Sequence, residues 1–280
     1  MFANYAVTGH AQPWRLLQAL VVAGVVSALV LPPAASAQDL SQFIDQTTDD
    51  FTKAEMSRSD IEAALAALPA GGVLDLSGKR LNKLDFSGMD LTRTKLTSAR
   101  INGCNFRAAN VSAVSLDGAW ALKSDFRDAK FIGTSLFQTQ MMDAQLDGAD
   151  FSNAMVGADM SRASITNAKF IDAMLAPDLT NQSMGLMRGV LKSARLDGAS
   201  FKGANLRRSA FEFASLKGVD FEGADLQGAE LSGADLTGAN VAGANLTKAD
   251  VNGAKLLGLR GKASMIGLDQ AVNLDKAVTD

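Results

Sequence analysis

The sequence predicts a solenoid whose coils have four sides, because large apolar residues recur every five positions over most of its length. The series runs from Leu76 to Leu175, with one residue deleted before Met160, then breaks and runs again from Leu186 to Leu256. It contains 36 centre positions. A period of five fits neither a helix nor a strand, so we expect each five-residue unit to form one side of a coil.

Small residues occupy fixed places around each centre. Two positions before the centre, 22 of the 36 residues are Ala, and two positions after it lie 16 of the 25 Gly residues. Ala121 is the one centre without a large apolar side chain. We expect the centre and the small residue before it to face inward, and the other three residues of the unit to face outward. About half of the 46 Ala among the 280 residues are therefore explained by this inward position.

The spacing of Phe residues predicts four sides for each coil. If a coil holds 20 residues, eight of the nine centre Phe have a Phe partner one coil away, as a ladder of stacked rings requires. These eight are Phe86, Phe106, Phe126, Phe131, Phe151, Phe170, Phe201 and Phe221. Pro is absent from 70–176 and 178–280, which leaves backbone N–H groups free to donate from coil to coil.

The repeated pattern Ala-(Asp/Asn)-(Leu/Phe)-x-x is clearest between Ala224 and Lys248, and it resembles the pentapeptide-repeat family over 73–258. The resemblance implies an all-β solenoid, a right-handed quadrilateral parallel β-helix with the Leu and Phe residues inside. The interior of such a helix is too narrow for a ligand. Function is therefore expected on the outer sides, at the ends, or where the repeat is broken.

Residues 1–37 have the features of a signal peptide. The apolar run 16–31 is shorter than the roughly 20 residues of a spanning helix, and the Ala-Ser-Ala motif ending at Ala37 fits a signal peptidase. We expect cleavage after Ala37, a periplasmic or secreted protein, and no membrane span after cleavage. The region before the run carries only Arg15 as a fixed positive charge, so an uncleaved anchor is the alternative.

Two further segments flank the repeats. Residues 38–72 have helical apolar spacing, a capping box at Ser59 and Glu62, and a stop at Pro69, so they predict a short helical segment. Residues 259–280 lose the five-residue period but keep apolar residues, and we expect them to cap the open edge of the last coil. In some relatives the equivalent end forms a homodimer interface, which is the alternative for this segment.

The repeat is broken at 176–185, which contains Pro177 and a polar run. This break is either a loop that leaves one corner or two degenerate repeats with an insertion. Loops on rigid scaffolds often carry function, whereas a tolerated bulge is the alternative. The candidate loop residues are Asp178, Thr180, Asn181 and Gln182.

Apolar residues at outward positions form a candidate interaction patch. They are Trp120, Leu122, Ile132, Phe137 and Met142. Met155 with Met174, and Ile132 with Ile171, form further outward pairs. Such a patch marks either a partner site or a surface covered by the protein's own chain. We favour the second interpretation, because the helices of 38–72 need a surface on which to dock.

The sequence offers little catalytic chemistry. Its only His, His10, lies in the leader, so the mature chain cannot form a Ser–His–Asp or Cys–His relay. Its only Cys, Cys104, occupies an inward small-residue position, and the strict Gly period excludes a phosphate-binding loop. The Asp residues that precede centres are expected to bond the corners: Asp85, Asp90, Asp125, Asp150, Asp220, Asp225 and Asp235. We therefore expect no metal, no cofactor and no enzyme.

Three functional hypotheses follow. The first is an exported, non-enzymatic scaffold that binds a protein or envelope component, whose identity the sequence does not give. The second, taken from the family, is a DNA mimic that binds a type II topoisomerase and protects or inhibits gyrase. Net charge alternates along the repeats, for example +5 over 186–218 and −5 over 219–254, which disfavours mimicry and nucleic-acid binding alike. The third is an enzyme with an unrecognised carboxylate site.

Overall fold

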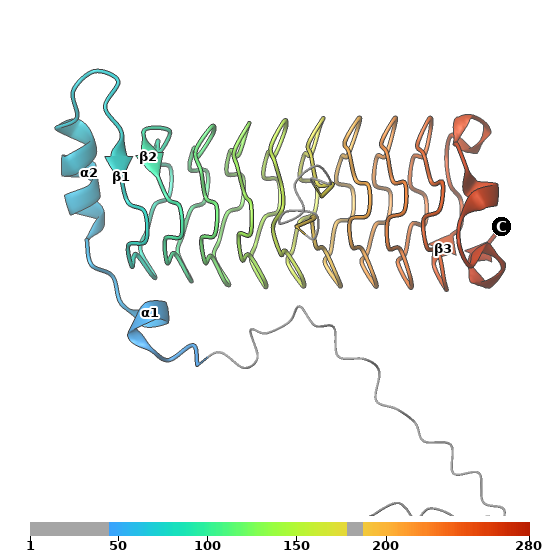
Figure 1. The fold of residues 1–280 in the computed structure, drawn as a ribbon, viewed down its shortest axis with the longest axis horizontal. Coiled ribbons are helices and arrows are strands. Elements are labelled where there is room, and N and C mark those ends of the chain that lie inside the picture. Colours follow the sequence, from blue (N-terminus) through green and yellow to red (C-terminus); the bar gives the residue numbers. More distant parts are fainter. Residues whose placement is uncertain (1–44, 178–186) are drawn as a thin grey trace, which may run out of the picture. The chain divides into compact units, whose positions relative to one another are not determined.

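Residues 73–177 and 187–258 wind into a stack of coils, and most complete coils use 20 residues (Figure 1). The computed structural model describes residues 45–177 and 187–280. Parallel bridges join residues one coil apart, such as Asp85 with Asn105. Around this bridge, Phe86 N donates to Asn105 O at 2.6 Å, and Asn105 N donates to Leu84 O at 2.9 Å. The predicted right-handed quadrilateral parallel β-helix is confirmed.

Each coil has four sides, which we name after their first centre residue. They are the Leu76, Leu81, Phe86 and Leu91 sides, and they follow one another in that order around each coil. The Leu76 side is therefore opposite the Phe86 side, and the Leu81 side is opposite the Leu91 side.

The sides are too short for long strands, so within the described residues regular strands occur only near the ends of the stack. β1 (Leu74–Asp75) pairs in parallel with β2 (Thr94–Lys95), and β3 (Lys255–Leu256) pairs in parallel with β4 (Val278–Thr279). Along the rest of the stack, the corners limit the pairing to isolated bridges, because the residue two positions after a centre usually adopts a positive φ. Gly223 has a φ of 67° and Ala113 a φ of 59° at this position. This left-handed corner is the reason for the Gly enrichment.

The core is a set of four columns of centre side chains. Phe86, Phe106 and Phe126 stack with ring centroids 4.6 and 4.7 Å apart. A second column contains five rings: Phe131, Phe151, Phe170, Phe201 and Phe221. All eight stacked rings were expected from the sequence, and the structure also joins Phe170 to Phe201 across the break, at 4.6 Å. Each of these rings is fully buried, so the ladder forms the centre of the stack.

The deletion and the break fall at the same corner of successive coils, where the Leu76 side turns into the Leu81 side. Gln140 pairs with Asp159, 19 residues later, and Asp159 pairs with Val190, 31 residues later. One coil thus lacks one residue and the next gains eleven, while the columns on either side stay in register. The eleven additional residues thus lie between Leu175 and Leu191, and the two predicted forms of the break concern residues 178–186, which lie outside the described residues. The centre that follows Leu175 in the described coils is Leu191, and the predicted centre Leu186 lies outside the described residues.

Two short helices precede the coils: α1 (Asp49–Thr52) and α2 (Arg58–Ala66). The capping box predicted at Ser59 and Glu62 is wrong. Ser57 is the N-cap, its Oγ accepts from Asp60 N at 3.2 Å, and its own N donates to Asp60 Oδ2 at 2.8 Å. Ser-x-x-acid spacing occurs at both places, and α2 begins at the earlier one, which leaves Glu62 to pair with Arg58 at 2.7 Å.

The C-terminal segment continues the coil with longer sides. Three 3₁₀ turns, η2 (Lys262–Ser264), η3 (Leu268–Gln270) and η4 (Leu274–Lys276), each follow a residue with a positive φ. The bridged residues Arg260, Ile266, Val272 and Val278 lie six positions apart rather than five. Leu268 and Leu274 pack partly buried against the core. A final coil of six-residue units thus covers the edge of the last five-residue coil.

Candidate functional site

The interior of the stack offers no site. Neighbouring Phe rings lie 4.4 to 4.7 Å apart over most of both ladders, so they are in contact and leave no space between them. Any binding surface in the described residues must therefore lie outside, as expected.

The five residues of the predicted patch do not form one surface. Trp120, Leu122 and Met142 lie on the Leu81 side, Ile132 on the Leu91 side, and Phe137 on the Leu76 side. Leu122 and Met142 are buried, with exposed fractions of 4% and 3%, whereas Ile132 is 41% exposed. Trp120 and Phe137 are half-buried. The structure thus brings together only the three residues of the Leu81 side.

Segment 45–55, which contains α1, covers the Leu81 side over its first coils. The Phe51 ring meets Trp120 edge to face at 5.5 Å, and the Arg100 guanidinium lies 5.0 Å from the centre of the Trp120 ring. Asn82 Nδ2 donates to the carbonyl oxygens of Asp50 and Lys53, at 3.0 and 2.8 Å. For Trp120 and Leu122, the structure therefore matches the intramolecular interpretation.

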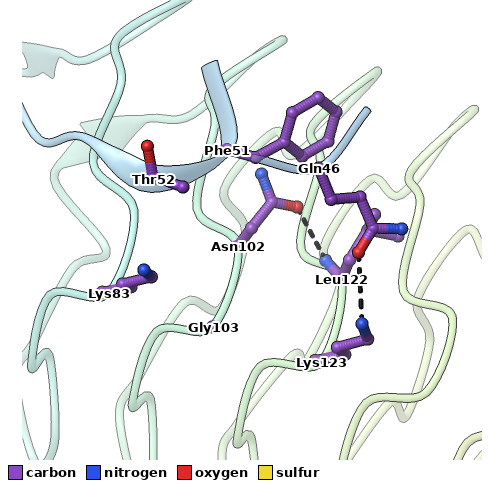
Figure 2. A pocket seen from close by; sticks show the side chains of 8 residues that line it. All are labelled: Gln46, Phe51, Thr52, Lys83, Asn102, Gly103, Leu122 and Lys123. Carbon is purple, nitrogen blue, oxygen red and sulfur yellow. Dashed lines mark hydrogen bonds between the residues drawn. The ribbon is translucent and has the colours of Figure 1, made fainter. Parts of the chain in front are cut away.

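Polar groups complete this contact and surround a small cavity (Figure 2). Lys123 Nζ donates to Gln46 Oε1 at 3.1 Å, and Leu122 N donates to Asn102 Oδ1 at 3.0 Å. The cavity has a volume of about 160 Å³. It is lined by Gln46, Phe51, Thr52, Lys83, Asn102, Gly103, Leu122 and Lys123. With few charged groups and no acid–base pair facing it, this cavity is best explained as a gap in the packing of α1 on the coils.

A different set of apolar residues stays exposed beside the break. Met155 and Met174 are bridged neighbours on the Leu76 side, with exposed fractions of 56% and 46%. Phe137 lies one coil before Met155 and packs over Gly157, the residue at the deletion, where an added Cβ would lie 3.4 Å from Phe137 Cδ2. Gln138 Nε2 donates to the sulfur of Met187 at 3.7 Å, where the chain returns from the break. We call Phe137, Met155 and Met174 the methionine patch.

Of the other predicted outward residues, Ile171 is half-buried, and the candidate loop residues Asp178, Thr180, Asn181 and Gln182 lie outside the described residues. Sequence reasoning missed Phe213, which is 71% exposed at a corner with a φ of 60°. The available signal was its place two positions after a centre, where Gly is the commonest residue.

The periodic carboxylates bond the corners, as predicted. Each of the seven accepts a hydrogen bond from the backbone N–H two residues later, between 2.9 and 3.1 Å. The hydroxyl and backbone N–H of Ser87 hold the pKa of Asp85 below its ordinary value. Burial raises the pKa of Asp235, but hydrogen bonds from Thr237 outweigh it and lower the pKa overall. These carboxylates therefore serve to hold the corners of the coils.

The remaining reactive groups have structural roles as well. Cys104 is 1% exposed, its Sγ donates to Leu81 O at 3.0 Å, and burial raises its pKa to about 12. Within residues 45–177 and 187–280, no three His, Cys, Asp or Glu side chains are placed to hold a metal ion. In the same ranges, no helix has the length and apolarity needed to cross a membrane.

The alternating charge bands also have a structural cause, because their basic and acidic residues pair with each other across one or two coils. Four basic residues of 186–218 form ion pairs with acids of 219–254. The pairs are Arg188–Glu230, Lys202–Glu222, Lys217–Asp235 and Arg207–Asp225, at 2.6, 2.9, 3.7 and 3.9 Å. Each side of the stack also carries both positively and negatively charged residues. The Phe86 side, for example, has Arg127 between Asp125 and Asp147.

The comparisons with known proteins agree with this architecture. The family profile described as pentapeptide repeats (8 copies) matches residues 75–107, 123–156, 140–176, 190–223 and 224–256. A search of curated protein sequences returned no match.

Among solved structures, the chain is similar to HetL, a pentapeptide repeat protein involved in heterocyst differentiation regulation from the cyanobacterium Nostoc. The two share 24% identity and a TM-score of 0.45 over 80% of this chain and 95% of that one. Full-length QnrB1, a plasmid-mediated fluoroquinolone resistance protein, shares 17% identity with this chain. Its TM-score is 0.40 over 74% of this chain and 92% of QnrB1. Because the family profile matches more than half of its residues, and in the register that the coils display, the chain belongs to the pentapeptide-repeat family.

Proposed function

We propose that this chain is an exported, non-enzymatic scaffold that binds a partner protein of the cell envelope through the methionine patch. The observation that carries the proposal is the exposure of Met155 and Met174, at 56% and 46%, on adjacent coils. In the other described repeats of this chain, the residue one position before the centre is mostly Asp, Asn or Ser.

Methionine suits such a surface because its side chain is flexible and polarisable and adapts to a partner. The coils hold both side chains on a backbone fixed by hydrogen bonds, since Met155 N donates to Thr134 O at 3.0 Å and Met174 N donates to Ala154 O at 2.9 Å. A partner therefore meets an ordered surface, and the entropic cost of ordering this backbone is already met by folding.

Export is tested first, by cell fractionation and by mass measurement of the amino terminus. We expect the protein in the periplasm or the medium with Gln38 as its first residue. Full-length chain in the cytoplasm would reject export, and full-length chain in the membrane fraction would indicate the uncleaved anchor.

Binding is tested in cells with a photo-crosslinking amino acid at Met155. The matched control is Gln145, which is exposed, lies one residue before its centre as Met155 does, and belongs to the opposite Phe86 side. We expect a defined adduct from Met155 that is absent at Gln145 and is lost when Met174→Asp is added. The same adducts from both positions would reject a specific site on the Leu76 side.

The topoisomerase hypothesis is tested with the purified mature protein in a gyrase supercoiling assay. An acidic track that imitates DNA needs one side with a continuous negative charge, and both signs occur on every described side. We expect no change in supercoiling. Inhibition or protection at a stoichiometric concentration would favour the DNA mimic over the scaffold.

A further inference from the structure

A second surface feature lies at the corner between the Leu76 and Leu81 sides, after the break. It is a pocket of about 450 Å³. Its lining comes from three successive coils and from the residue at which the chain rejoins them: Arg188, Arg207, Arg208, Gln227, Gly228, Glu230 and Lys248. Four basic side chains and one carboxylate give this lining a formal net charge of +3.

Arg188 and Glu230 form a fixed wall of the pocket. Arg188 Nη1 and Nη2 donate to the two carboxylate oxygens of Glu230, at 2.6 and 2.8 Å. Arg188 Nη1 also donates to Arg208 O at 2.7 Å, and the Arg188 side chain is only 18% exposed. The two charges neutralise each other, so the remaining basic groups are not balanced by the acid of the pocket.

The other three basic side chains of the pocket form few ion pairs. Arg208 and Lys248 take part in no ion pair within the described residues, and Arg207 has only a distant contact, 3.9 Å from Asp225, with its side chain 49% exposed. Arg208, Gly228 and Lys248 occupy the same corner in three successive coils, so Gly228 separates the two cations without a side chain of its own. At about 4.8 Å for each coil, their backbones lie roughly 10 Å apart.

We propose that this pocket binds a phosphate-bearing anion with at least two negative charges. The Arg, Lys and Gln227 side chains supply N–H donors, and the one carboxylate is occupied by Arg188. Phosphate oxygens accept several such bonds at once, and Arg offers paired donors that match them. The lining contains no aromatic ring on which a base could stack, so a soluble phosphate compound or a lipid headgroup fits better than a nucleic acid. This inference does not depend on export or on the methionine patch.

The test measures pyrophosphate binding to the full chain by calorimetry at constant ionic strength. The variant is Arg208→Gln with Lys248→Gln, which removes two charges from the pocket. The control is Lys95→Gln with Lys169→Gln, which removes two exposed charges that form no ion pair within the described residues. We expect the pocket variant to bind at least tenfold more weakly and the control to change by less than twofold.

Arg208 and Lys248 have φ values of 57° and 60°, so Gly is suited to both positions if the Gln variant folds poorly. Vesicles of phosphatidylglycerol, compared with phosphatidylcholine, separate the two sources of phosphate. Vesicle binding that the pocket variant loses together with pyrophosphate assigns a headgroup, and loss of pyrophosphate alone assigns a soluble ligand. The proposal is overturned if the wild type does not bind pyrophosphate, or if the pocket variant and the control bind it equally.

Discussion

Two regions of this protein carry apolar residues at outward positions, and they differ in what lies over them. On the Leu81 side, Trp120 and Leu122 are covered by α1, and Leu122 is 4% exposed. On the Leu76 side, Met155 and Met174 are 56% and 46% exposed. Both regions depart from the repeat in the same way, because a large apolar residue replaces a polar one.

An apolar outward residue in a solenoid is therefore not by itself a partner site. In the first region the chain supplies its own cover, and that cover depends on named contacts between Phe51 and Trp120 and between Asn82 and the α1 backbone. In the second region no such contact is formed by the described residues. Substitutions in each region test whether coverage by α1 is what distinguishes the two.

The largest expected effect on stability comes from a substitution that introduces a charge beneath α1. Leu122→Asp places a carboxylate in a buried position without a partner, which we expect to destabilise the docking of α1 by about 3 kcal/mol. The reporter is the amide of Glu55, which donates to Arg80 O at 2.7 Å and so joins this segment to the coils. Its hydrogen exchange should become about 100-fold faster.

The matched control for this change is Met155→Asp, at an exposed outward position. It should leave the exchange rate of the Glu55 amide unchanged. It should also change the free energy of unfolding by no more than about 0.5 kcal/mol. Equal effects of the two substitutions would show that cover does not distinguish the regions.

A smaller effect is expected from Phe51→Ala, which removes the edge-to-face contact with Trp120. The loss should be about 1 to 2 kcal/mol of docking free energy. In a Trp14→Phe background, Trp120 is the only Trp, so its emission should shift to the red as the ring becomes exposed to water. Phe213→Ala, which removes a ring that is 71% exposed, should leave the emission unchanged. A red shift in both variants would contradict docking by Phe51.

Most of the coil architecture could be predicted because each residue's environment repeats every five positions. The Phe ladders, the inward Ala residues and the corner-bonding Asp residues all follow from that period and from the 20-residue coil. The six-residue units of the cap also have a signal in the sequence, which is the spacing of Gly261, Gly267 and Asn273, but this period differs from the five-residue period of the coils.

The candidate site was harder to predict, because cover is a long-range property. Phe51 meets Trp120 across 69 residues of sequence, and nothing near Trp120 distinguishes it from Met155. The basic pocket combines Arg188 with residues one to three coils later, and only the register across the break brings them to one corner. Counting net charge along the sequence could not separate Arg188, which is paired, from Arg208, which is not.

The backbone conformation of the corners can be tested separately from the coverage of the sides. Gly223 and Ala113 occupy equivalent corners of the Leu91 side, with φ values of 67° and 59°. No atom lies within 4 Å of a Cβ added at Gly223, so Gly223→Ala tests backbone conformation alone and should destabilise by about 1 kcal/mol. Ala113→Gly should stabilise by up to about 1 kcal/mol, as measured by chemical denaturation. Opposite signs support the corner explanation, and destabilisation by both would contradict it.

The smallest expected effect concerns the region after the break, where Glu230 anchors Arg188. Burial raises the pKa of Glu230, but the hydrogen bonds and charge of Arg188 outweigh it and lower the pKa below 4.5. A carboxyl whose pKa is lower in the folded state stabilises above its unfolded pKa, and that contribution is lost as the pH falls through the folded value. Glu230→Gln should therefore cost less than about 1 kcal/mol at pH 7, and the difference from wild type should vanish well below pH 4.

The control for this pair is Glu222→Gln, whose partner Lys202 is 53% exposed, compared with 18% for Arg188. An exposed pair contributes little, so this substitution should change stability by less than Glu230→Gln does at pH 7. If the two variants behave alike, Arg188 is not fixed by Glu230, and the region after the break is held by its backbone contacts alone. If only Glu230→Gln responds to pH, an ion pair holds the chain at Arg188 against the coils, much as Phe51 holds α1.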